Sequence, residues 1–307
     1  MGHGKVNTLA GFARRSKPPS PRHSLIATLH GQIHPQTACI LFSKVPAEVR
    51  NRIFYFAFYS YDDVSRPYPS SSYYSRPGYR YHQRISTNLL IACRRIYTEA
   101  HNLPISLNEH VFWCSWEGGP RRKKNTSDRN PKFFFQNMTI EQRSAIDRIH
   151  LFTQVQWLRE LFVVFCELKD IHPKYLKISI RHTDWQDWDR SETPLDITLE
   201  WIRDLKLMSK LRKFYLELES IEKRKDQVDA IVTKLIPQRL TTGNSDVLKA
   251  GHTLIAGYQY TRPAVYVDNY NRARYFSKDN DSWVTGDDQV VAVDEILCIV
   301  STVMWSV

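Results

Sequence analysis

The chain has 307 residues, of which 42% are hydrophobic and 24% charged, so it can build a sizeable core in one large or two modest domains. Its formal net charge is +11. Residues 1–47 hold six basic and no acidic side chains, and residues 117–132 hold six basic and two acidic ones, which together give +10 of this excess. Because the excess lies in a predicted tail and a predicted loop, it argues against a nucleic-acid-binding face on a folded element.

Cysteine usage and hydropathy indicate the compartment. The five cysteines form no CxxC pair, which argues against a disulfide scaffold and a zinc ribbon and indicates a reducing environment. No apolar segment follows the basic residues at the start. The longest apolar run near the end, Val290–Trp305, contains two acidic residues and is too short for a membrane span. We therefore expect an intracellular protein of the nucleus or cytoplasm, with no signal peptide and no membrane contact.

The first predicted helix follows a tail. Residues 1–38 are rich in Pro, Ser, Gly and basic residues without periodicity, which predicts a disordered basic tail. Residues 45–58, VPAEVRNRIFYFAF, predict a helix, because Pro46 suits its first turn and Glu48 favours the positive end of its dipole. At 100° per residue this helix has two apolar faces on opposite sides. One consists of Val45, Val49, Ile53 and Phe56, and the other of Phe54 and Phe58.

A long loop and a second helix are expected next. Residues 60–84 are rich in Tyr, Ser, Pro and Arg and keep neither a helical nor a strand period. Their aromatic side chains can stack on bases or drape over the domain surface. Residues 86–104 predict one helix, capped at Ser86 or Thr87 and stopped by Pro104. The segment 110–114, HVFWC, then predicts a short buried strand. We expect the second helix to cover one face of the first.

Helices and strands alternate in the rest of the chain. Residues 117–135 predict a basic linker, and the region 136–307 an α/β domain with a C-terminal extension. Strands centred near Ile149, Ile178 and Tyr215 alternate with helical segments, which favours neighbouring parallel strands. This series also fits a leucine-rich-repeat-like solenoid. Thr139 and Gln142 have capping-box spacing, and the apolar end is expected to pack back onto the body. The fold class is therefore α+β.

Motifs for chemistry are sparse. Nucleotide-binding, zinc-protease and hydrolase signatures are absent from the sequence. The strongest candidate is RHTDWQDWD at residues 181–189, since clustered carboxylates suit a hard cation and a His beside an Asp can act as a base. The alternative is a solvated loop with Trp185 and Trp188 against the body. We expect a non-enzymatic protein without a cofactor, a catalytic residue or a metal site.

Two segments resemble a known family. KVPAEVRNRIFYFAF (44–58) resembles the LPxEIRNxIYxxAL pattern of fungal F-box-like proteins, and IACRRIYTEA followed by LNEHVFWC (91–114) resembles their CRxIYxEA … ENxFxF pattern. Val45 stands where the pattern has Leu, and Leu107 stands where an aromatic is common. The resemblance covers residues 42–114, and it implies an F-box-like helical domain over residues 39–116.

The resemblance also implies a function. F-box domains dock on the Skp1 adaptor of cullin ubiquitin ligases, and the region that follows them recruits a substrate protein. Val45, Pro46, Val49 and Ile53 match the first-helix motif, so the resemblance implies that they bind the adaptor, whereas the residues alone fit an internal core equally well. The alternative function is nuclear nucleic-acid binding through the basic tail and the Tyr/Arg-rich loop, aided by the cluster Arg121–Lys124.

Overall fold

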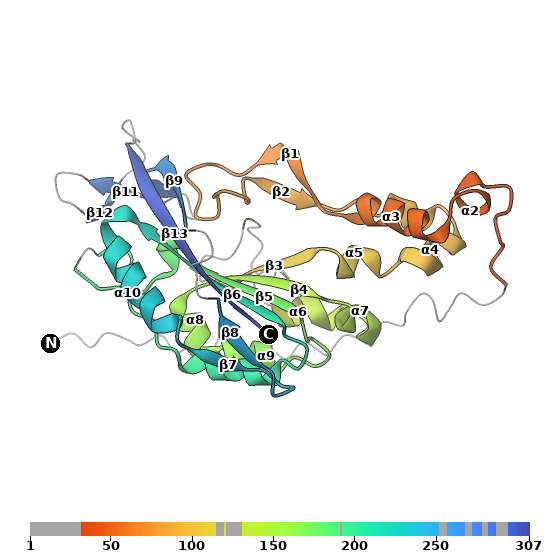
Figure 1. Ribbon diagram of the computed structural model, residues 1–307. Coiled ribbons are helices and arrows are strands. Elements are labelled where there is room, and N and C mark those ends of the chain that lie inside the picture. Colours follow the sequence, from red (N-terminus) through yellow and green to blue (C-terminus); the bar gives the residue numbers. More distant parts are fainter. Residues whose placement is uncertain are drawn as a thin grey trace.

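The computed structural model shows a mixed α+β fold in which short helices pack on a central sheet, in agreement with the predicted mixture of helices and strands (Figure 1). Within the residues that the structure describes, no helix has the length and apolar character needed to cross a bilayer. The described residues are 32–114, 120, 131–190, 192–251, 257–267, 272–277, 282–286 and 294–307.

Four parallel strands, β3 to β6, form one half of the central sheet and are neighbours in the order of the chain, as the helix–strand alternation predicted. β13 lies antiparallel beside β6, which confirms that the apolar end packs back onto the body. The other edge of β13 pairs with β9 and β8, and β7 pairs with β8 at the end of the sheet. The strands are β3 (Glu109–Cys114), β4 (Arg148–Thr153), β5 (Tyr175–Ile180), β6 (Lys213–Ile221), β7 (Arg239–Thr241), β8 (Val247–Ala250), β9 (Tyr258–Pro263) and β13 (Glu295–Ser306).

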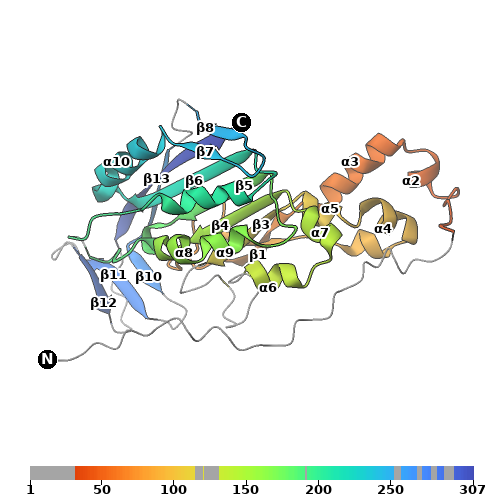
Figure 2. The ribbon, with the colours of Figure 1, turned by 90° about the horizontal axis from the view of Figure 1, so that it is seen from below.

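One face of this sheet holds the main hydrophobic core. Side chains alternate along a strand, so Ile149 and Leu151 of β4 belong to the same apolar layer as Leu216 and Leu218 of β6, and all four are almost completely buried. Helices cover this layer on the side that Figure 2 presents. They are α6 (Pro131–Gln136), α7 (Ile140–Ser144), α8 (Val155–Glu160), α9 (Phe162–Cys166), η4 (Glu200–Leu207) and α10 (Lys225–Leu235). Two short 3-10 turns, η3 (His182–Asp184) and η5 (Glu222–Arg224), follow the carboxyl ends of β5 and β6.

The opposite face is covered by residues 68–80, where Arg76 contacts Glu217 of β6 and Tyr79 packs on Phe152 of β4. Residues 60–84, predicted to form one long loop, are not a loop throughout. They contain an antiparallel hairpin of β1 (Tyr61–Pro67) and β2 (Tyr81–Arg84), joined by residues 68–80 (Figure 1). β1 is exposed along almost its whole length, so no apolar alternation was needed and the strand signal was missing. A small antiparallel sheet lies beside them, with β10 (Val265–Val267), β11 (Ala273–Ser277) and β12 (Ser282–Gly286).

Short helices form the N-terminal part of the described chain. The single helix predicted over residues 86–104 is wrong, because Cys93 has extended backbone and its Sγ caps a new helix by accepting a hydrogen bond from the Ile96 amide at 3.5 Å. Pro104 lies in the first turn of the last helix and does not end it. The helices are α2 (Ile40–Ser43), α3 (Ala47–Phe58), η2 (Asn88–Ile91), α4 (Arg94–Ala100) and α5 (Leu103–Ser106).

Other predictions were mixed in outcome. The capping box is confirmed, since the Gln142 amide donates to Thr139 Oγ1 at 3.2 Å and the Thr139 amide donates to Gln142 Oε1 at 3.0 Å. The helical segment expected between the strands near Ile149 and Ile178 is two short helices, separated at Leu161 by a non-helical backbone conformation. Residues 1–31 of the predicted tail and most of the predicted linker lie outside the described residues, so the predicted domain boundaries stay predictions.

Candidate functional site

The predicted partner-binding residues lie at the start of α3 and along one of its faces. Pro46 precedes the first helical residue and is exposed, and Val45 is half-buried. Val49 is 51% exposed, Ile53 41% and Phe56 65%. The stripe that was predicted from the helical period is therefore an exposed apolar surface of the described structure.

The other face of α3 is the covered one. Phe54 and Phe58 are fully buried and pack with Ile96 and Ala100 of α4 in a small separate core. Burying each phenylalanine contributes roughly 2–3 kcal/mol, which is enough to fix the rotation of a 12-residue helix on its neighbours. The sequence predicted two apolar faces without showing which one the chain covers, and the structure assigns that role to Phe54 and Phe58.

A partly buried ion pair also holds α3 in this orientation. Arg50 Nε lies 2.8 Å from Glu99 Oε2 of α4, and Arg50 Nη1 donates to the Val45 carbonyl at 3.2 Å. Burial by itself would raise the pKa of Glu99, but hydrogen bonds from Arg50 and Arg95 lower it below its ordinary value. Arg50 therefore packs inward, and the face with Val49 and Ile53 points away from α4.

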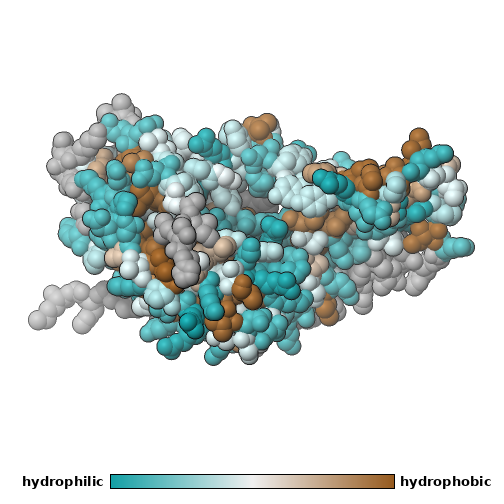
Figure 3. Space-filling model, in the orientation of Figure 1, coloured by the Kyte–Doolittle hydropathy of each residue, from teal (hydrophilic) through white to brown (hydrophobic). Residues whose placement is uncertain are grey.

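Other short helices of this part of the chain also expose large apolar side chains. Ile40 of α2 is 71% exposed and Ile91 at the end of η2 is 86% exposed. Figure 3 shows several separate hydrophobic patches at the end of the molecule that α2 and α3 form. Large exposed apolar patches on a protein surface mark sites of protein or membrane interaction, whereas single exposed apolar residues carry no such meaning.

The cluster at residues 181–189 does not assemble as a metal or acid–base site. Asp184 is 2% exposed, and both of its carboxylate oxygens are bound by Arg181, at 2.6 and 2.8 Å. His182 is fully buried, and burial together with Arg224 and Arg262 lowers its pKa to about 3. Among the described residues, no group of three or more His, Cys, Asp or Glu side chains is arranged to hold a metal ion.

The same segment does line a surface cavity of about 380 Å³ at the carboxyl ends of β4 and β5. Aromatic walls from Tyr73 and Trp188 face polar groups of Gln154, Thr183 and Arg272 there. Asp189 forms an ion pair with Arg274, which also lies over the Trp188 ring, 5.8 Å from its centre. The predicted alternative is confirmed in part: Trp185 packs against the body, being 3% exposed with its Nε1 donating to the Glu219 carbonyl, but the segment is not a solvated loop, because His182 and Asp184 are buried as well.

A buried polar network that the sequence did not reveal lies between the sheet and residues 68–80. Arg76 has a 2% exposed side chain, which lies 2.7 Å from Glu217 Oε1 and 3.3 Å from Glu219 Oε2 of β6. Lys177 Nζ, on β5, lies 2.9 Å from Glu217 Oε2. Burial would raise the pKa of Glu217, but Arg76 and Lys177 outweigh it and lower the pKa to about 2. The signal in the sequence was the run Glu217, Leu218, Glu219 within a strand, which puts two acids on the face away from the apolar core.

The chain can present Arg76 there because of the turn that follows it. Pro77 and Gly78 occupy the middle of the turn from Arg76 to Tyr79, where the Tyr79 amide donates to the Arg76 carbonyl at 2.9 Å. Gly78 has a φ of 80°, which is the conformation that the third residue of a type II turn requires. RPGY is therefore a turn signal that the sequence carries.

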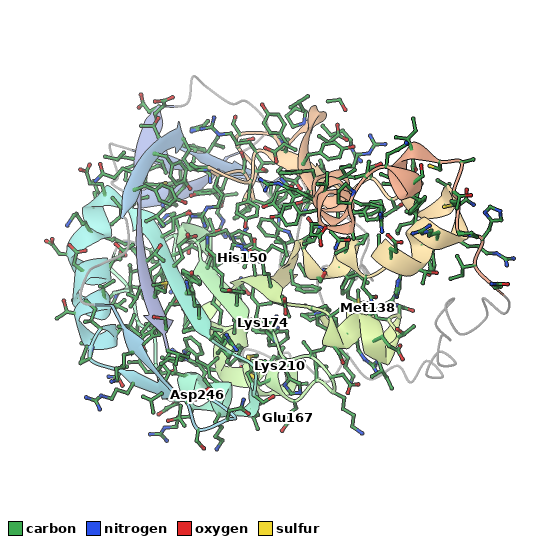
Figure 4. All side chains as sticks on the ribbon, turned by 45° about the vertical axis from the view of Figure 1, so that its right-hand side comes forward. Met138, His150, Glu167, Lys174, Lys210 and Asp246 are labelled. Carbon is green, nitrogen blue, oxygen red and sulfur yellow. The ribbon has the colours of Figure 1, made fainter. Side chains whose placement is uncertain are left out.

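His150 continues the network along the sheet. Its Nε2 lies 2.8 Å from Ser179 Oγ, which donates to Glu217 Oε1 at 2.8 Å, and its Nδ1 lies 2.5 Å from Tyr79 Oη. Figure 4 places His150 in the interior of the molecule. Burial lowers its pKa, although Glu109, whose Oε2 lies 3.3 Å from Nδ1, acts in the opposite direction. Ser179 is fully buried, so this Ser–His pair is not exposed to a substrate.

The basic and aromatic residues on which the nucleic-acid-binding alternative rests are partly outside the described residues and partly packed on the body. The start of the basic tail and Arg121–Lys124 are outside the described residues. Within the Tyr/Arg-rich segment, Arg76 is buried and the ring of Tyr73 packs on Tyr266 with their centres 5.3 Å apart. This segment therefore packs on the body, as one of the two interpretations expected.

Comparison with known proteins gives no relative. No protein-family model matches the chain, and no match to it was found among curated proteins or solved structures.

Proposed function

We propose that the protein is a non-enzymatic interaction protein, an F-box-like substrate receptor that docks through α3 on a Skp1-type adaptor of a cullin ubiquitin ligase. The observation that carries the proposal is the exposure of Val49 and Ile53 on a helix whose opposite face is anchored by fully buried Phe54 and Phe58. An amphipathic helix with an open apolar stripe fits a partner that offers a hydrophobic groove. Pro46 and half-buried Val45 extend this stripe to the start of α3.

In this proposal the α/β body recruits the substrate protein. The order of β3 to β6, with helices on one face, supports a leucine-rich-repeat-like origin for this half. It departs from an open solenoid because residues 68–80 cover the face opposite the helices, through Arg76, Glu217 and Glu219.

The test is recovery of the adaptor. The full chain is purified with a Skp1-type adaptor and cullin, beside a known F-box protein as the positive control. We expect Val49→Asp and Ile53→Asp to abolish recovery of the adaptor, because each places a charge in an apolar interface. Val247→Asp is the matched control, since Val247 is 40% exposed on β8, far from α3, and it should leave recovery unchanged.

Circular dichroism of each variant shows whether a loss of adaptor binding comes from a lost docking surface or from a lost helix. Asp at position 49 falls in the first turn of α3, where a negative charge is favourable, so that helix should persist. The docking proposal fails if the wild-type chain recovers no adaptor while the control F-box protein does, or if Val49→Asp and Val247→Asp behave alike.

A further inference from the structure

A second cavity, of about 280 Å³, lies between residues 67–81 and β9, where Figure 1 shows the hairpin connection beside that strand. Three arginines line it, Arg76, Arg80 and Arg262, and no carboxylate does. Its remaining walls are hydroxyl-bearing, aromatic and proline side chains, among them Ser75, Tyr81 and Pro263. The lining is therefore rich in hydrogen-bond donors and poor in negative charge.

Two of these arginines keep donors without a partner. Arg262 is 5% exposed, and its Nη2 donates to the carbonyls of Ser70 and Ser72, at 3.3 and 3.1 Å. The Nε of Arg262 has no hydrogen-bond partner among the described residues, and neither has the Nε of Arg76, which is 3% exposed. Both Nε atoms are themselves buried, so they add positive charge next to the cavity without being open to a ligand in it.

The balance of charge gives the sign of that acceptor. Arg76 and Lys177 are matched by Glu217 and Glu219, which contact them from the sheet. Within the described residues, neither Arg80 nor Arg262 has an ion pair with a carboxylate. Arg262 instead lies over the Tyr266 ring, 3.9 Å from its centre. Two positive charges therefore remain at the cavity for an anion to neutralise.

We propose that this cavity binds a phosphate monoester. The planar guanidinium groups of Arg262 and Arg80 match the geometry of phosphate oxygens, and Arg76 lines the same cavity. The space exceeds what a bare phosphate ion fills, and Tyr81 and Pro263 give the group that carries the phosphate an apolar wall. The site lies on the α/β body and involves no residue of α3, so it stands independently of adaptor docking.

Calorimetric titration of the full chain tests the proposal. The probes are inorganic phosphate, glucose 6-phosphate and a short peptide carrying phosphoserine, with glucose and the unphosphorylated peptide as blanks, each at up to millimolar concentration. Of the two esters, the one that binds more tightly identifies the source of the phosphate, a small metabolite or a modified protein. We expect at least one ester to bind and neither blank to bind.

Variants locate the binding. Arg80→Gln removes an exposed charge and should leave the fold intact while weakening ester binding about tenfold. Arg262→Lys keeps the positive charge but loses the planar guanidinium group, and it should weaken ester binding by a similar factor. The matched control is Arg239→Gln, an exposed arginine on β7, which should change affinity less than about twofold.

Three results would overturn the proposal. The first is that no ester binds to the wild-type chain. The second is that Arg80→Gln, Arg262→Lys and Arg239→Gln have equal effects, which would mean diffuse electrostatic binding. The third is that inorganic phosphate binds and both esters do not, which would leave a site for a free anion and not for a monoester.

Discussion

Replacement of Arg76 by methionine tests the buried network directly. The side chains of Arg76, Glu217 and Glu219 are 2%, 5% and 2% exposed. Glu217 keeps Lys177 at 2.9 Å in the variant, so Glu219 is the buried carboxylate that loses its ion-pair partner. Removing one partner of a buried ion pair costs about 3–5 kcal/mol, and we expect Arg76→Met to lower the free energy of unfolding by that amount.

Urea unfolding followed by the fluorescence of the 8 tryptophans measures this loss. Arg84→Met is the control, because Arg84 is 65% exposed and its pair with Asp63 is 4.0 Å long, so the loss should stay below about 1 kcal/mol. Adding Glu219→Gln to Arg76→Met should recover about 2 kcal/mol, since the stranded charge is removed. The reasoning is refuted if Arg76→Met is no less stable than Arg84→Met, or if Glu219→Gln makes the double variant worse.

Three further outcomes are expected. Phe54→Ala should cost about 3–5 kcal/mol in chemical unfolding of the helical part, whereas Phe56→Ala, at an exposed position, should cost less than about 1 kcal/mol. His182 stays neutral in the folded chain until about pH 3, but it takes up a proton in the unfolded chain below its ordinary pKa of 6.5, so stability must fall as the pH drops. His182→Phe should therefore remove about 2 kcal/mol of the wild-type loss between pH 7 and pH 5, and an unchanged pH profile would contradict this. A thiol reagent should modify exposed Cys39 at once. The buried thiols of Cys114, Cys166 and Cys298 should react slowly, because burial raises the pKa of each. A fast reaction of these three thiols would contradict the fold.

Periodicity predicted the parts of the fold whose two faces differ. β4, β5 and β6 each have an apolar face under the helices, so their alternation survives in the sequence and their parallel order followed from the helices between them. β1 has no buried face, and its strand could not be seen in the same way. The break at Cys93 was missed because its Sγ replaces the usual oxygen cap, a role that a helical stripe of apolar residues does not reveal.

The candidate sites also differ in whether a local sequence pattern encodes them. The apolar stripe with Val49 and Ile53 was predictable, because both positions follow the helical period of one short segment. The contact of Arg76 with Glu217 joins residues 141 positions apart, and Arg262 is further still from the segment it contacts. No local pattern encodes such pairings, so the buried network and the basic cavity required the folded chain.

The placement of β13 has a consequence for the order in which the chain folds on the ribosome. β3 to β6 can pair as they emerge, since each is next to its predecessor in sequence. The free edge of β6 must then wait, because Ile221 pairs with Cys298 and Lys213 pairs with Ser306, and both partners lie in β13, which is synthesised only after β7 to β12. During that interval β6 presents an open row of backbone donors and acceptors, which is the kind of edge that recruits other strands. A nascent chain halted before β13 is therefore the form of this protein that most needs a chaperone.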